Sequence, residues 1–152
     1  MATLTELLSD LESKIESKDL INANVSERDV CWHIAHSLKV LHNIIVATQN
    51  SNPNEYCWKF NRNRSIVFLM NKFPRGKGKA PKAVIPADEA SSEELRTELH
   101  TVRQLLQELE SLHPKSHFNH PIFGQLNLKQ TKKVLAIHTK HHIKIMDDII
   151  RS

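Results

Sequence analysis

The most restrictive feature of this sequence is the recurrence of apolar residues at spacings of three and four in four separate windows. These windows begin near residues 3, 26, 92 and 127. Residues at that spacing share one face of an α-helix, so each window predicts an amphipathic helix with one buried side. Only three glycines occur in the chain, and two of them lie in one basic loop. The pattern therefore predicts an all-α fold.

Capping residues give the expected limits of these helices. The first covers residues 3–18, the second is capped by Ser26 and runs to about Thr48, the third is capped by Ser91 or Ser92, and the last runs from about Asn127 to Ile150. The shorter segment "SIVFLMNKF" is interpreted as a helix, with a strand as the alternative. The segment "HPKSHFNHPIFGQ" is expected to be a loop, because it holds two prolines and a glycine.

The length and the order of these segments predict the architecture. A chain of 152 residues suits a single domain, here residues 1–152, with one core. Four long helices with one long connection between the second and the third indicate a four-helix bundle. That connection is long enough to let the second and third helices run parallel.

Composition limits the compartment and the partners. No apolar run approaches the roughly 18 residues that span a bilayer, and the N-terminus lacks the basic and apolar layout of a signal peptide. The two cysteines, Cys31 and Cys57, are too few for a disulfide framework. These features predict a cytoplasmic protein with no membrane partner.

The net charge of +4 is concentrated in the basic loop 75–82, within "FPRGKGKAPK". It is interpreted as a solvated loop, with a phosphate or nucleic-acid patch as the alternative. No aromatic residue interleaves with its lysines, so bases have nothing to stack on and nucleic acid is not an expected partner. The basic side chains of this loop could instead recognise an anionic substrate or a thiol. They are Arg75, Lys77, Lys79 and Lys82.

Three histidines lie within "AIHTKHHIKIMDDII" in the last predicted helix. A strict three-four rhythm marks its buried stripe, formed by Leu128, Thr131, Leu135, His138, His142, Ile145 and Ile149. His138 and His142 are therefore stacked on the buried face, while His141 lies about 60° around the helix, at the edge of the stripe. Two imidazoles at i and i+4 can bind one metal ion, and hydrogen bonds inside the core are the alternative.

The second predicted helix, "VCWHIAHSLKVLHNII", could supply a third ligand. At about 100° per residue, His33 falls well inside the apolar arc, His36 lies at one edge, and His42 lies on the polar side. His33 is thus the first candidate for an inward ligand and His36 the second. Ser37, beside His33, is a hydrogen-bond donor to the site or a small residue that lets helices approach closely.

Two segments together resemble the DinB/YfiT-like superfamily of metalloenzymes: "WHIAHSLKV", 32–40, and "HPIFGQLNLKQTKKVLAIHTKHHIKIMDDI", 120–149. The resemblance implies a four-helix bundle that binds a divalent metal, zinc or nickel, through His33, His138 and His142. His36 matches a position that is often polar in relatives. His141 matches an extra histidine beside the pair, at the pocket mouth or behind the ligands, with exposed packing as the alternative. His120 matches a loop-anchoring histidine. Relatives often form homodimers, for which "IVFLM" is a candidate interface or, alternatively, a cap on the core.

Three neutral imidazoles would leave a coordination position open, as catalytic metal sites do. The expected function is a metal-dependent enzyme, a hydrolase or a thiol-dependent transferase, acting on a small molecule that is anionic or a thiol. No general base can be placed from the sequence. A non-catalytic metal-binding or stress-response module and a plain helical interaction protein remain as alternatives.

Overall fold

The protein is described by a computed structural model that covers residues 2–76, 80–86 and 89–152. Its helices are α1 (Leu4–Ser13), α2 (Val30–Gln49), α3 (Arg62–Met70), α4 (Ser92–Glu110) and α5 (Leu128–Arg151). The remaining elements are β1 (His117–His120), β2 (Gly124–Asn127) and the short 3-10 turns η1 (Ile15–Ser17), η2 (Pro53–Glu55) and η3 (Lys82–Val84). Lys77 and Lys79 of the basic loop lie outside the described residues.

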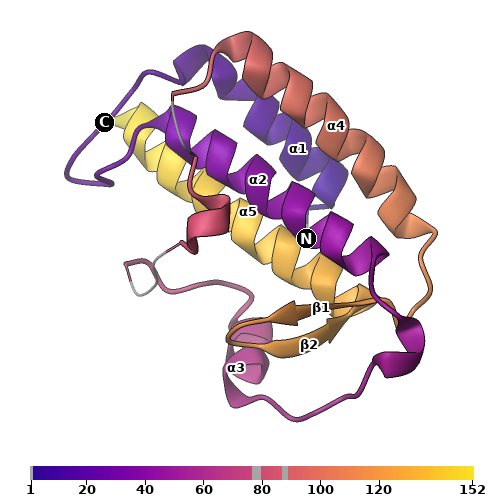
Figure 1. Cartoon of the computed structure of the whole chain (residues 1–152). Coiled ribbons are helices and arrows are strands. Elements are labelled where there is room, and N and C mark those ends of the chain that lie inside the picture. The colour runs from indigo at the N-terminus through magenta and orange to yellow at the C-terminus, as the bar shows by residue number, and fades with distance from the viewer. Residues whose placement is uncertain (1, 77–79, 87–88) are drawn as a thin grey trace.

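The four long helices form a bundle in which α2 packs against α4 and α5, and α1 packs against the same two helices from the other side. Figure 1 shows that α2 and α4 run in one direction and that α1 and α5 run in the other. Side-chain bonds agree, because His42 meets Glu98 near the start of α4 and Gln49 meets Glu108 near its end. The predicted four-helix bundle with a long connection between its second and third helices is confirmed.

The predicted apolar stripes form the main core. Its largest fully buried side chains come from every bundle helix and include Leu8, Leu11, Ile34, Leu38, Leu95, Leu99 and Leu135. Burying one such leucine contributes roughly 1.5–3 kcal/mol, so this shared core is the main source of stability in the bundle. It also sets the rotation of α5 and directs one face of that helix towards α2.

One helix start and one helix end differ from the sequence expectation. The carboxylate of Asp29, and not Ser26, accepts the backbone N–H of Trp32 at 2.8 Å, and α2 therefore begins at Val30. The first helix ends at Ser13 and is followed by η1, because its last turn tightens into 3-10 geometry. The Ser91 cap of α4 is confirmed, with a reciprocal bond between the Glu94 carboxylate and the Ser91 N–H.

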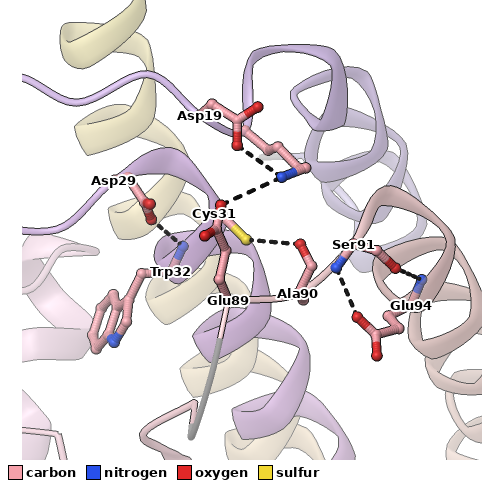
Figure 2. Close-up of polar contacts among 9 residues, drawn as sticks. Asp19, Asp29, Cys31, Trp32, Glu89, Ala90, Ser91 and Glu94 are labelled. Carbon is pink, nitrogen blue, oxygen red and sulfur yellow. Dashed lines mark hydrogen bonds and ion pairs between the residues drawn. The ribbon is translucent and has the colours of Figure 1, made fainter.

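The parallel starts of α2 and α4 are joined by short polar contacts, which Figure 2 shows beside the Ser91 cap. The Cys31 thiol donates to the carbonyl of Ala90 at 3.4 Å. Lys18 reaches Asp19 at 2.7 Å and Glu89 at 3.6 Å. These contacts hold the end of the long connection against the first turn of α2.

The segment expected to be a loop before the last helix contains a β-hairpin. In it, β1 and β2 pair antiparallel, with Phe118 opposite Leu126. Gly124 closes the turn with φ of +70°, a conformation in which a side chain would be strained. The prolines and the glycine correctly indicated a turn. Strands of four residues, however, are too short to give a periodic pattern from which their pairing can be predicted.

The hairpin packs with α3 around a second, smaller core. Its buried residues are Val67, Phe123, Leu126, Val134 and Ile137. The interpretation of "SIVFLMNKF" as a short helix is confirmed, and this helix lies with the hairpin at one end of the bundle (Figure 1).

Candidate metal centre

Three histidines from two neighbouring helices converge on one point. His36 comes from α2, and His138 and His142 come from consecutive turns of α5. One ring nitrogen from each lies within 4.8 Å of the other two, which is close enough for a single ion to contact all three. The antiparallel packing of α2 on α5 produces this convergence, since His36 and the pair approach from opposite sides.

His36 is held in one orientation and one tautomer. Its Nδ1 lies 2.8 Å from the backbone carbonyl of Val84 in η3. Because a carbonyl oxygen only accepts, Nδ1 carries the proton and Nε2 keeps its lone pair. The ring also stacks on Trp32, with centroids 4.7 Å apart and planes at 12°. Nε2 therefore points at His138, whose own Nε2 is 3.3 Å away.

His142 is supported from behind by His33. The Nδ1 atoms of these two rings are 2.9 Å apart, and Nε2 of His33 lies 3.0 Å from the hydroxyl of Ser26. Both nitrogens of His33 are thus used in a chain that runs from Ser26 to His142. In the tautomer in which Nδ1 of His142 donates to His33, Nε2 of His142 keeps a lone pair that can bind an ion.

The hydrogen bonds among the described residues leave polar atoms at this site unsatisfied. Nδ1 of His138 is buried without a partner, and so is the indole Nε1 of neighbouring Trp32. Unsatisfied buried polar atoms are rare in native proteins and often mark the place of an ion, a water or a ligand. The indole N–H of Trp32 only donates, so it calls for an acceptor such as a water or a ligand atom. The fit to a bound metal rests instead on the three converging histidine nitrogens.

The electrostatics of the cluster favour neutral rings. Burial lowers the pKa of His138 to about 3 and the pKa of His36 below its ordinary value. Burial, together with the neighbouring histidines, lowers the pKa of His142 further. Burial also lowers the pKa of His33 to about 4. Neutral imidazole is the form that binds metal, so these rings are prepared for an ion near neutral pH.

The structure brings together two of the three predicted ligands, His138 and His142, on the face expected from their spacing. The sequence assigned the third ligand to His33, whereas the third converging nitrogen belongs to His36. His33 is buried one step further from the convergence point, behind His142. Ser37 is buried too, but its hydroxyl donates to the carbonyl of His33 within α2.

The remaining predicted residues lie around the cluster. His141 is half-buried at the edge of the stripe, with its ring 6.1 Å from Phe73 and 5.2 Å from His142. Nδ1 of His120 accepts the backbone N–H groups of Ile122 and Phe123, both at 3.1 Å. His120 thus anchors the hairpin turn through these two hydrogen bonds.

Sequence reasoning did not identify three contributors to the site. Trp32 stacks on His36, Phe73 places its ring 6.2 Å from His138, and Val84 supplies the carbonyl that orients His36. Trp32 was detectable, since it precedes His36 by four residues and shares its helix face. Phe73 and Val84 come from the long connection, whose path over α2 has no periodic signal.

No helix among the described residues is long and apolar enough to cross a membrane.

Comparison of the chain with models of protein families, with curated proteins and with solved structures finds no match. The geometry of the three histidines therefore carries the functional argument without support from relatives.

Proposed function

We propose that this protein is a metal-dependent enzyme that binds one divalent ion through His36, His138 and His142. The observation that carries the proposal is the convergence of their three nitrogens within 4.8 Å inside a helical bundle. His36 replaces His33 in the ligand set expected from the sequence. Zinc or nickel is the proposed ion, because imidazole suits both metals and carboxylate ligands, which hard cations prefer, are absent from this cluster of described residues.

The surrounding residues support this role by fixing the ligands. A metal-binding histidine usually donates its other N–H to a carbonyl or another acceptor, which sets its tautomer and orientation. The carbonyl of Val84 does this for His36, and His33 does it for His142. Trp32 and Phe73 cover the cluster with aromatic surface and keep bulk water away from the rings.

The proposed reaction is hydrolysis or transfer to or from a thiol. A metal ion held by three histidines would keep one coordination position open. There it would polarise a carbonyl or lower the pKa of a bound water or thiol. The substrate is proposed to be a small anionic molecule or a thiol, because Arg75 lies near the edge of the cluster. Burial, and after it the Arg75 guanidinium, lowers the pKa of His141. Asp148 holds that guanidinium at 2.8 Å.

Elemental analysis of the purified protein, together with anomalous diffraction at the metal edge, tests the proposal. We expect about one equivalent of metal and an anomalous peak between α2 and α5, both lost in His138→Ala. A folded protein without metal, and without affinity for added Zn²⁺ or Ni²⁺, would overturn the proposal. The histidine pairs would then be hydrogen-bonded residues in a plain helical interaction protein.

A specific observation favours a second candidate, a metal-binding module without catalysis. Among the described residues, none of the hydrogen bonds to His36, His138 or His142 involves a carboxylate, so no general base is in place. Screening the fully metal-loaded protein against ester, amide and thiol-transfer substrates separates the two candidates. Turnover that disappears in His36→Ala supports the enzyme, and a silent screen on the loaded protein supports the module.

A further inference from the structure

The segment 56–86 differs in charge from the rest of the molecule. It holds eight of the 21 Lys and Arg residues and none of the 17 Asp and Glu residues. The remaining 13 basic residues are outnumbered by the 17 acidic ones, so the rest of the chain carries a net charge of −4. A partner of this segment is therefore expected to be anionic.

Exposed apolar side chains gather in the same part of the fold. Among the described residues, nine large hydrophobic side chains are exposed. Six of them belong to the segment around α3 and to the hairpin turn beside it: Trp58, Phe60, Ile66, Leu69, Met70 and Ile122. We call these six residues the α3 face. Leu69 is 87% exposed and Phe60 is 71% exposed. Such a concentration marks an interaction surface more often than scattered single residues do.

The α3 face is held in place by a buried arginine. The guanidinium of Arg64 donates to the carbonyl of Lys59 at 2.6 Å, to that of Phe123 at 3.2 Å and to that of Gln125 at 3.4 Å. The Asn61 amide also donates to the carbonyl of Ile122 at 2.9 Å, which ties the start of α3 to the hairpin turn. The exposed side chains are therefore presented from an ordered platform.

α3 carries apolar residues on two sides. Val67 faces the small core, while Leu69 and Met70 face outwards. A helix that is apolar on both sides is normally buried on both sides. Exposed Lys59, Arg62 and Lys72 stand beside these outward residues in the sequence. The partner must therefore offer apolar contact and negative charge together.

We infer that the α3 face docks on an anionic lipid surface. Acyl chains can take up the aliphatic side chains, headgroups can pair with lysine and arginine, and Trp58 suits the boundary between the two. α3 lies beside the hairpin at one end of the bundle (Figure 1), and Leu69 and Met70 are exposed there. The sequence expectation of no membrane partner rested on the lack of a spanning segment, and this proposal departs from it because surface docking requires no such segment.

Two other occupants fit the α3 face less well. A second copy paired through this face would bring like charges together, because a two-fold interface places the same patch on both sides. Nucleic acid would pair with the basic groups, and bases could stack on Trp58 and Phe60. The aliphatic Ile66, Leu69 and Met70, however, have no π face on which a base can stack.

Co-sedimentation with vesicles of phosphatidylcholine, with and without phosphatidylglycerol, tests the inference on the full chain. We expect binding only to the vesicles that contain phosphatidylglycerol, weakened by added salt. The double variant Leu69→Glu/Met70→Glu should weaken this binding about tenfold or more. Ile21→Glu, a control at another exposed apolar position, should bind as the unchanged protein does. Circular dichroism checks that both variants are folded.

Three outcomes would overturn the inference. One is equal sedimentation of the double variant and the unchanged protein, or no sedimentation of either. A second is binding of a single-stranded oligonucleotide without binding of vesicles, which assigns the face to nucleic acid. The third is a dimer in sedimentation velocity that the double variant abolishes, again without vesicle binding. None of these results bears on the proposed metal site, which lies elsewhere in the fold.

Discussion

At the scale of single residues, the histidines divide by what each ring nitrogen contacts. His36 has one nitrogen on a carbonyl and one directed at the cluster. His33 has both nitrogens in hydrogen bonds to Ser26 and His142. Two histidines that are equally buried on the same helix thus have different capacities to bind an ion.

This difference predicts unequal effects of alanine substitution on metal affinity. His36→Ala removes a proposed ligand, while His33→Ala removes the proposed support for His142, for which a loss of about 10–100-fold is typical. We expect His36→Ala to weaken Zn²⁺ binding more than His33→Ala does, measured by competition with a chromophoric chelator. His42→Ala is the matched control, because His42 bonds Glu98 at 2.6 Å outside the cluster. A larger loss of Zn²⁺ affinity in His33→Ala than in His36→Ala would identify His33 as the third ligand.

The two cysteines should differ in reactivity. Burial raises the pKa of the Cys31 thiol, which also donates to Ala90 (Figure 2), whereas Cys57 is exposed. Since the thiolate is the reactive form, iodoacetamide should label Cys57 and spare Cys31 in the folded protein. Mass spectrometry of the digested protein measures this, with a urea-unfolded sample as the control. Rapid labelling of Cys31 under native conditions would contradict its burial.

At the scale of elements, the long connection between α2 and α4 does more than link them. It places η3 against α2, where Val84 orients His36 and where Lys39 donates to the carbonyl of Ile85 at 3.1 Å. It also contains α3, which completes the small core with the hairpin. One connection therefore contributes to the candidate metal centre and to the α3 face.

Arg64 ties α3 to the hairpin through its hydrogen bonds to Phe123 and Gln125. Replacing it with methionine would leave the buried carbonyl of Phe123 without this donor, at a cost of roughly 1–3 kcal/mol, and would also remove the part-buried bond to the carbonyl of Gln125. We expect Arg64→Met to lower the urea midpoint and to speed hydrogen exchange in 62–70. The neighbouring, exposed Arg62→Met should change stability by only about 0.5 kcal/mol or less. Equal effects of the two substitutions would contradict this account.

At the scale of the whole molecule, neutral histidines that are buried or half-buried couple stability to pH. The pKa of His33 and that of His120 are lowered to about 4, and that of His138 to about 3, from an ordinary value of 6.5. The unfolded chain therefore takes up protons at a higher pH than the folded one. Stability is full above pH 6.5 and falls as the pH drops from there towards the folded values.

Chelator-treated protein should thus lose stability between pH 7 and pH 5, by up to about 1.4 kcal/mol per pH unit for each such histidine. The ordinary pKa of a glutamate is 4.5, and the pKa values of Glu12 and Glu94 are lowered from it in the folded protein. These carboxylates therefore titrate mainly below this pH window. Urea unfolding at several pH values measures the slope. A flat profile across this range would show that the histidines are not held neutral, and added Zn²⁺ should raise the whole curve.

The sequence by itself determined the four bundle helices, the buried stripe of α5 and the inward position of His138 and His142. Each is a matter of helical periodicity, which is local and repeats every three or four residues. Only the tertiary structure decided between His33 and His36. Both rings are buried, because α5 covers one side of α2 and Val84 of η3, 48 residues beyond His36 in the chain, covers the other. The carbonyl that orients His36, the hairpin and the α3 face depend on such long-range packing, for which the sequence has no periodic signal.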